Sequence, residues 1–217
     1  MTSKPGPVAG AMKYCERCGE SHLHVTPELL DDVHGSEDDF AETEDLKQHM
    51  ADMLRYREPY AFLNLDDLDR ILRWKLRSQH ARNAHLHERL TAEMVQSVTE
   101  TAFAVHLSHG PSDDAAARVC LDMLSTLPGV RIPVASAILA MTFPAHHCVV
   151  DVRVWRLVFG ERKPPTLGSN HYLRYRTVVA CIANTMDWSI QETDLSLWEL
   201  DRRQTLPASV TTRHSGG

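Results

Sequence analysis

Two helical patterns in the middle of the sequence are separated by a turn of only a few residues, and this arrangement constrains the fold most. The first follows a capping residue among Ser112, Asp113 and Asp114. Its apolar side chains recur at helical spacing: Ala116, Val119, Cys120, Met123, Leu124 and Leu127. The turn Leu127-Pro128-Gly129-Val130 comes next. Pro133 suits the start of a second helix, whose residues Val134 to Leu139 are small or apolar on nearly every side. The sequence therefore predicts a compact helical hairpin over about residues 115–141.

Helical spacing also dominates the rest of the sequence from residue 46 onward. One apolar face is formed by Leu46, Met50, Met53 and Leu54. Asn64 has Asp67 three residues after it, which is typical of a helix N-cap, and another helical pattern begins near Thr91. The one short run typical of a strand is Cys148-Val149-Val150. We expect an all-α fold with a single domain over residues 46–205.

Length and composition narrow the class of protein. The chain of 217 residues can bury one substantial core with a small appendage. No stretch approaches the roughly 20 apolar residues that span a bilayer, and the N-terminus lacks the layout of a secretory signal. We therefore expect no membrane partner and a cytoplasmic, nucleoid-associated location.

Charge is unevenly distributed along the chain. The net charge is -6, but the segment from Arg70 to Arg176 contains 14 Lys/Arg and only 8 Asp/Glu. A segment with this excess of basic residues can face the phosphates of a nucleic acid. The overall negative charge therefore does not exclude a DNA partner.

Residues 1–45 resemble a separate extension, with a Pro/Gly-rich start and an acidic run from Glu37 to Asp45. We expect this extension to be loosely ordered, and residues 206–217 to form a disordered tail. The N-terminal extension contains a Cys/His cluster formed by Cys15, Cys18, His22 and His24. Thiolates and imidazoles suit zinc, although structural zinc sites usually place the second ligand pair further along the chain, so ordinary reduced thiols are the alternative. Too few cysteines follow Asp151 to bind an iron–sulfur cluster.

The predicted hairpin has the features of a phosphate-binding element. Gly129 permits a tight turn, and the unbonded N–H groups at the start of the second helix would point toward a phosphate without reading its sequence. Because the second helix is apolar all round, we expect it to be buried and only the tip of the hairpin to be exposed.

Asp151 occupies a predicted helix N-cap, since Val154, Leu157 and Val158 mark one face of the helix that follows. A carboxylate in this position is kept ionised by the N–H groups and the dipole of the helix. It could stabilise an oxocarbenium-like sugar, the species that develops when a base is cleaved from deoxyribose, or orient the attacking water. A simple helix cap is the alternative.

These motifs together resemble those of a known family. The turn Leu127-Pro128-Gly129-Val130, the helix Ala135 to Leu139 and the segment Val150 to Val154 resemble, in order and spacing, the helix-hairpin-helix, the Gly/Pro-rich loop and the aspartate of the endonuclease III superfamily of DNA glycosylases, also called HhH-GPD. The family's loop motif, Val-Asp-Thr-His-Val, is matched here at both valines and at Asp151. The specific resemblance covers about residues 115–160, and a weaker one, to a little-characterised bacterial branch, covers about 60–200.

The resemblance implies a two-lobed helical domain that binds double-stranded DNA, with Asp151 as the catalytic residue. It places DNA contacts at Gly129, Val130, Arg131, Pro133 and Arg153. Bifunctional members have a lysine nucleophile where this chain has Pro133, and proline cannot form a Schiff base. The expected activity is therefore hydrolysis of the N-glycosidic bond of a damaged or modified base, without lyase activity and without a required cofactor. Arg131 replaces a family glycine, so it could alter the phosphate site or contact phosphate itself.

Several alternatives remain open. Trp74 and Lys75 are candidates for the base pocket, although packing for the tryptophan and solvent for the lysine are the alternatives. Arg153 could equally lie on a solvated helix face. The whole chain could be a helix-hairpin-helix module that binds DNA without catalysis, or a protein-interaction domain whose N-terminal arm recruits partners.

Overall fold

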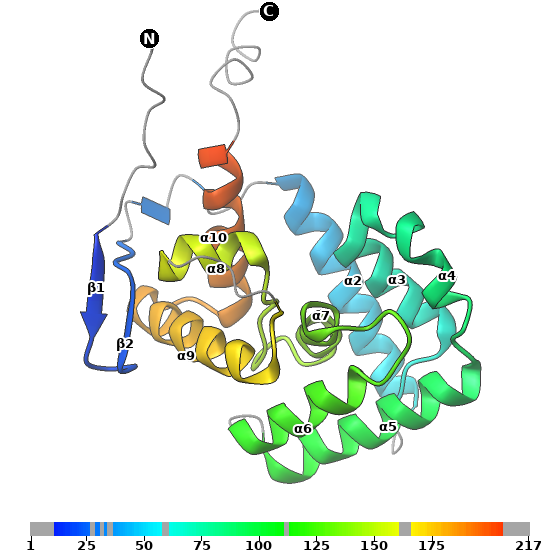
Figure 1. Cartoon of the computed structure of the whole chain (residues 1–217). Helices are drawn as coiled ribbons and strands as arrows, with labels where there is room; N and C mark the ends of the chain where they lie inside the picture. The colour runs from blue at the N-terminus through cyan, green and yellow to red at the C-terminus, as the bar shows by residue number, and fades with distance from the viewer. Residues whose placement is uncertain are drawn as a thin grey trace, which may run out of the picture.

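The structure is a computed structural model that describes residues 11–26, 29–30, 33, 37–57, 61–110, 113–160 and 166–205. These residues form a mostly helical chain with one small two-stranded sheet (Figure 1). The helices are α2 Glu37–Tyr56, α3 Leu65–Leu76, α4 Ala84–His87, α5 Ala92–His109, α6 Asp114–Leu124, α7 Ile132–Thr142, α8 Val152–Phe159, α9 Ser169–Met186 and α10 Ile190–Thr205, with 3-10 turns at Arg77–Gln79 and Ala81–Asn83. The strands are β1 Met12–Cys15 and β2 Glu20–Leu23. The expectation of a helical fold is confirmed, with the sheet as its exception.

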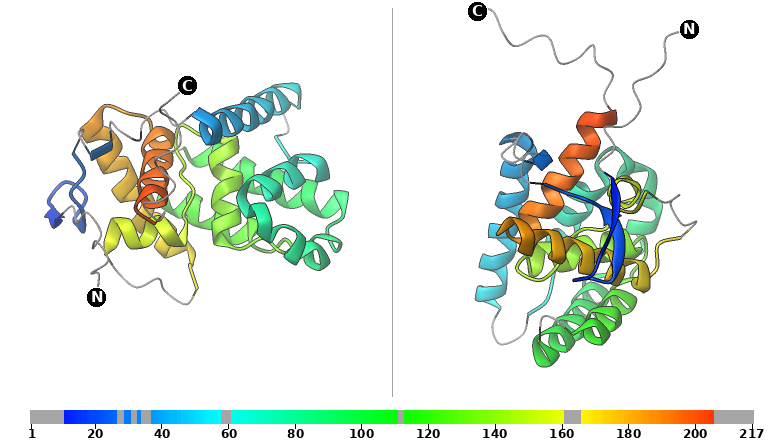
Figure 2. Two further views of the ribbon diagram at one scale, coloured as in Figure 1. Left: turned by 90° about the horizontal axis from the view of Figure 1, so that it is seen from above. Right: turned by 90° about the vertical axis from the view of Figure 1, so that its left-hand side faces the viewer.

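Helix α7 lies at the centre of the molecule, with two groups of elements around it. Helices α3 to α6 lie on one side, and α8, α9, α10 and the two strands lie on the other (Figures 1 and 2). The described side chains of α7 are almost all buried, including Ala135, Ile138 and Leu139 at 0% exposure. A helix whose residues are small or apolar on nearly every side is expected to be buried, as its sequence predicts.

Local capping explains where several helices begin. Asn64 and Asp67 form a reciprocal capping box at the start of α3. Thr91 accepts from the Met94 N–H at the start of α5, and Asp113 accepts from two N–H groups at the start of α6. The caps at Asn64 and Asp113 agree with the sequence prediction, and α5 begins near Thr91 as expected.

The acidic run is ordered, contrary to the expectation for residues 1–45. Helix α2 begins at Glu37 and therefore includes the run up to Asp45. Acidic residues at a helix N-terminus interact favourably with its dipole, so this composition is compatible with a helix start as well as with a solvated tail. Leu46, Met50 and Met53 are buried, and α2 packs against α3 and α7. Helix α2 therefore belongs to the helical domain.

A β-hairpin precedes α2, which also differs from the expected loose extension. Strands β1 and β2 are antiparallel, with Met12 opposite Leu23 and Cys15 opposite Glu20. The hairpin packs against α8 and lies beside α9 (Figure 2). The expected tail at 206–217 and the start of the extension at 1–10 lie outside the described residues.

The extended segment Cys148-Val149-Val150 forms no strand, because side chains satisfy its backbone. The Val149 N–H donates to Asp194 Oδ2 at 2.7 Å, and the Val150 N–H donates to Ser136 Oγ at 3.2 Å. Gln191 on α10 donates to the His147 carbonyl. Buried polar side chains of α7 and α10 thus fix the segment that leads into Asp151.

Helix α9 is a long helix that was not predicted from the sequence. Its side chains Tyr172, Tyr175, Val179 and Ile182 are all buried.

Within the described ranges, no helix combines the length and the apolar character needed to cross a membrane.

Candidate functional site

Asp151 is the N-cap of α8, as the sequence predicts. Its Oδ1 accepts a hydrogen bond from the Arg153 backbone N–H at 2.9 Å, and its own backbone is extended. The preceding segment is anchored by Asp194 and Ser136, so the carboxylate is held from both sides. The role expected for Asp151 in catalysis stays a prediction.

Lys75 is the charged partner of Asp151. Its Nζ lies 2.9 Å from Asp151 Oδ2, and the side chains of Lys75 and Asp151 are 11% and 26% exposed. Lys75 belongs to the last turn of α3, so the contact joins the two groups of elements that flank α7. The alternative considered for Lys75, a solvent-exposed side chain, is therefore not observed.

The environment keeps Asp151 ionised. Burial raises the pKa of this carboxyl, but the charge of Lys75 and the hydrogen bonds from Arg153 N–H and Lys75 Nζ outweigh it, so the pKa lies below its ordinary value. A carboxylate has about four lone-pair positions. The two hydrogen bonds of Asp151 leave capacity for a further partner.

A cavity of about 260 Å³ opens beside this ion pair. It lies between α2 and α3, the start of α8, and α10, and it is lined by Thr43, Trp74, Lys75, Leu76, Arg77, Ser78, Gln79, Val149, Asp151, Arg153, Val154, Asp194, Leu195 and Trp198. Pockets for drug-sized ligands measure about 300–1,000 Å³. This cavity therefore suits a smaller group, about the size of a ring system.

Two tryptophans contribute to the walls of the cavity. Trp74 is half-buried, and its Nε1 donates to Thr43 Oγ1 at 3.2 Å. Trp198 on α10 is also half-buried, with the Arg77 guanidinium 5.6 Å from its ring centroid. Both residues are partly exposed and line the same cavity as Asp151, so a planar ligand in the cavity could contact them.

Arg77 adds a strained backbone to the cavity. It ends α3 with φ of 46°, in the region that favours glycine. A non-glycine residue in such a conformation costs of the order of 1–3 kcal/mol and is often found at binding sites. Arg77, Lys75 and Arg153 are the three basic residues among the described residues that line the cavity, and Arg77 and Lys75 pair with Glu42 and Asp151.

Asp194 is a second carboxyl at the cavity and was missed as a site residue. The Tyr175 hydroxyl and the Val149 N–H both donate to it. Burial raises its pKa to about 6, despite these hydrogen bonds, which lower the pKa. An aspartate within a helical pattern gives no sequence signal that it is buried. Its position shows that it supports the backbone in front of Asp151.

The predicted helical hairpin is present between α6 and α7. Gly129 has φ of +80° in the turn. Val130 is buried, and its N–H donates to the Leu127 carbonyl. Arg131 is the exposed N-cap of α7, and Pro133 is the second residue of this helix, one position later than expected, because Ile132 begins it. Among the described residues, the N–H groups of Gly129, Arg131 and Ile132 have no backbone acceptor.

The tip of this hairpin is less exposed than expected. A Cβ at Gly129 would lie 2.7 Å from Cδ2 of His87, so the His87 ring of α4 lies directly on the turn. Neither ring nitrogen of His87 has a hydrogen-bond partner in the described part of the chain. Arg131 and Arg153 are both exposed, so they remain accessible to a partner.

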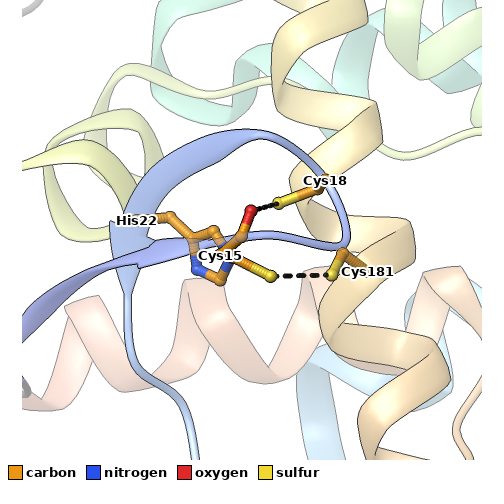
Figure 3. Close-up of side chains that lie close together, drawn as sticks. All are labelled: Cys15, Cys18, His22 and Cys181. Atoms are coloured by element: carbon orange, nitrogen blue, oxygen red, sulfur yellow. Dashed lines mark hydrogen bonds between the residues drawn. The ribbon is translucent and has the colours of Figure 1, made fainter.

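The cysteine cluster differs in one residue from the sequence prediction. Cys15, Cys18 and His22 lie together, but His24 is exposed and outside the cluster, and the fourth member is Cys181 of α9 (Figure 3). Contact across 166 residues leaves no spacing in the sequence. The Cys18 backbone N–H and the nearby His22 imidazole lower the pKa of Cys15 to about 6.

Comparisons with protein-family models, with curated proteins and with solved structures gave no match to this chain. Functional inference therefore depends on the residues and geometry described above.

Proposed function

We propose that this protein is a DNA glycosylase without lyase activity, which binds double-stranded DNA and hydrolyses the N-glycosidic bond of a damaged or modified base. The observation that carries the proposal is the ionised Asp151, paired with Lys75 at 2.9 Å, in a ring-sized cavity lined by Trp74 and Trp198. The motif resemblance around Asp151 and the hairpin supports the same assignment.

Asp151 would act on the sugar. Cleavage breaks the C1′–N bond, whose electron pair leaves with the base, and positive charge develops on the deoxyribose. An ionised carboxylate beside this charge lowers the barrier, as in glycoside hydrolysis. Water then bonds to C1′ and loses one proton, which Asp151 would accept, while the departing nitrogen of the base takes up one proton from solvent. The products are the free base and an abasic site.

The cavity would hold the extruded base. Enzymes that act on a base in duplex DNA remove it from the stack, and aromatic surfaces bind the flipped ring. Trp74 and Trp198 both line the cavity and would supply such surfaces. Lys75 and Arg77, which also line the cavity, would supply hydrogen-bond donors.

The helical hairpin would bind the phosphate backbone. The N–H groups of Arg131 and Ile132 at the start of α7 have no backbone acceptor among the described residues, and helix N-termini attract phosphate. The Arg131 and Arg153 side chains add positive charge. Because Val130 is buried and its N–H is already bonded, its proposed part is to shape the turn rather than to contact DNA.

Duplexes carrying different damaged or modified bases test the proposal. Wild-type protein is incubated with each end-labelled duplex, and hot alkali then reveals abasic sites as strand breaks. Asp151→Asn is the matched control, because asparagine caps a helix as well as aspartate but carries no charge. We expect breaks with wild type and none with the variant. Breaks of equal yield with both proteins would refute the role of Asp151.

Borohydride trapping tests the absence of lyase activity. Lys75 is the one lysine among the described residues that line the cavity, and a lyase would form a Schiff base with the sugar through such an amine. We expect no covalent protein–DNA product and no strand break before alkali. A trapped product that disappears in Lys75→Met would contradict the hydrolytic assignment.

A second candidate function is DNA binding without catalysis. It is favoured by the structural contacts of Asp151, since each of its two oxygens already accepts one hydrogen bond, from Arg153 N–H and from Lys75 Nζ. This module would bind duplexes with strong salt dependence and leave every base in place. The alkali assay separates the two candidates, since only a glycosylase creates abasic sites.

A further inference from the structure

Four metal-ligating atoms converge at the end of the molecule opposite α3. The Sγ atoms of Cys15, Cys18 and Cys181 and a ring nitrogen of His22 all lie within 4.8 Å of one another (Figure 3). Three of these residues come from the β-hairpin, and Cys181 comes from α9. The β-hairpin and a helix distant in sequence thus supply four candidate ligand atoms.

His22 is oriented as a ligand would be. Its Nδ1 lies 2.8 Å from the Leu23 carbonyl oxygen, while Nε2 is buried and has no hydrogen-bond partner in the described part of the chain. Metal-ligating histidines usually donate their other ring N–H to a carbonyl or carboxylate, which fixes the tautomer and the ring orientation. The side chain is only 8% exposed, so water does not readily satisfy Nε2.

The turn of the β-hairpin brings the Sγ atoms of Cys15 and Cys18 close together. The Gly19 N–H donates to the Cys15 carbonyl at 2.8 Å, and Gly19 has φ of +71°. A Cys-x-x-Cys spacing closed by such a turn is common in structural zinc sites.

The sulfur spacing fits a tetrahedral ion. With Zn–S bonds of about 2.3 Å, two sulfurs of a tetrahedron lie about 3.8 Å apart. The Sγ atoms of Cys15 and Cys181 lie 3.6 Å apart. A disulfide requires about 2.05 Å. The geometry is therefore closer to a shared ion than to a covalent bond.

We propose that Cys15, Cys18, His22 and Cys181 bind one structural Zn²⁺ ion that fastens the N-terminal β-hairpin to α9. Three thiolates and one imidazole complete a four-coordinate site, with no open position for a substrate. On binding, each thiol that is still protonated loses its proton to solvent. The assignment is independent of the proposed glycosylase function.

The ion would stabilise a hairpin that has few other attachments. An isolated two-stranded hairpin is marginally stable in water. Apart from the cluster, its described contacts with the body include the Glu20–Arg174 ion pair at 2.8 Å, a hydrogen bond from Arg17 to Thr185 Oγ1 at 3.2 Å, and packing on α8. Because α8 packs against β2 and begins next to Asp151, the metal would also stabilise the part of the cavity wall that α8 forms.

Metal analysis of the full chain tests the site. We expect about one equivalent of zinc per chain in wild-type protein. Cobalt added to metal-free protein should give the charge-transfer bands of thiolate ligation and the visible bands of a tetrahedral ion. Cys181→Ser and His22→Ala should lose or strongly weaken metal binding. His24→Ala, at the exposed neighbouring histidine, should bind as wild type does.

Thiol alkylation keeps the proposal testable if Cys181→Ser does not fold. In wild-type protein, a chelator should increase the alkylation of Cys15, Cys18 and Cys181 and leave the buried Cys120 unchanged. Absence of bound zinc or cobalt would overturn the proposal. So would unchanged binding in Cys181→Ser, or a Cys15–Cys181 disulfide found by peptide mapping of protein purified with reductant.

Discussion

Replacing Lys75 by methionine tests whether this lysine holds Asp151 in its ionised form. Methionine keeps most of the apolar stem of lysine and removes only the charge. In wild-type protein the pair lies largely out of solvent, with side-chain exposures of 11% and 26%. The variant therefore leaves a partly buried carboxylate without its cation.

The expected loss of stability is about 1–2 kcal/mol at neutral pH. Breaking a fully buried ion pair costs about 3–5 kcal/mol. Asp151 retains some solvent contact and its hydrogen bond from the Arg153 N–H, so roughly a third of that cost is expected. Urea unfolding of both proteins measures the difference.

The pH dependence provides the sharper signature. In wild type the pKa of Asp151 is lowered, so the carboxylate contributes stability above its unfolded pKa of about 3.9, and this is lost as pH falls through the lower folded pKa. Without Lys75, burial dominates and raises the folded pKa, so the ionised form destabilises the variant. Its deficit should be largest near neutral pH and should shrink on acidification.

A double-mutant cycle with Asp151→Asn isolates the pair. The two substitutions should be strongly non-additive, because the ion pair is lost in either single variant. The reasoning is refuted if Lys75→Met unfolds within about 0.3 kcal/mol of wild type, which is the usual error of additivity. A deficit that does not change with pH would refute it equally.

Three further outcomes are expected. Gly129→Ala should cost about 1–3 kcal/mol in urea unfolding, because its φ is +80° and the new Cβ would lie 2.7 Å from His87 Cδ2; adding His87→Ala should recover part of this loss, and no recovery would locate the strain elsewhere. The raised folded pKa of Asp194, about 6, favours folding at low pH, and this stability is lost as pH rises from about 4 through 6; Asp194→Asn should flatten that slope, and an unchanged slope would assign it to another group. Arg131→Ala should lower the slope of log K against log salt for duplex binding by about 1, whereas an unchanged slope would remove Arg131 from the phosphate contacts.

Local signals in the sequence predicted much of the fold. Asn64, Asp113 and Asp151 cap helices as expected, since a cap depends on residues within one turn, and α5 begins after Thr91, near where its pattern was predicted to start. The prediction failed where two local outcomes have the same composition. The acidic run beginning at Glu37 suits both a solvated tail and a helix start, and packing on α7 selects the helix.

The candidate sites depended on contacts that no local pattern encodes. Lys75 and Asp151 are 76 residues apart, and Cys15 and Cys181 are 166 apart. Sequence motifs identified Asp151 in the first pair and Cys15 in the second. Lys75 was also a candidate residue, but its contact with Asp151 was not predicted. Sequence reasoning selected His24 because it lies close in sequence, whereas the fold brings Cys181 from α9. Asp194 was missed because burial of a helical aspartate follows from tertiary packing alone.

The excision rate under single-turnover conditions tests the central claim most directly. Wild type and Asp151→Asn are compared at saturating protein on the same modified duplex, so that differences in DNA affinity do not contribute. Removing charge stabilisation of this kind lowers rates by about 10²–10³-fold. We predict a loss of that size with DNA binding retained. Equal rates for the two proteins, including no excision by either on any modified duplex that binds, would contradict the assignment of Asp151 as the catalytic carboxylate.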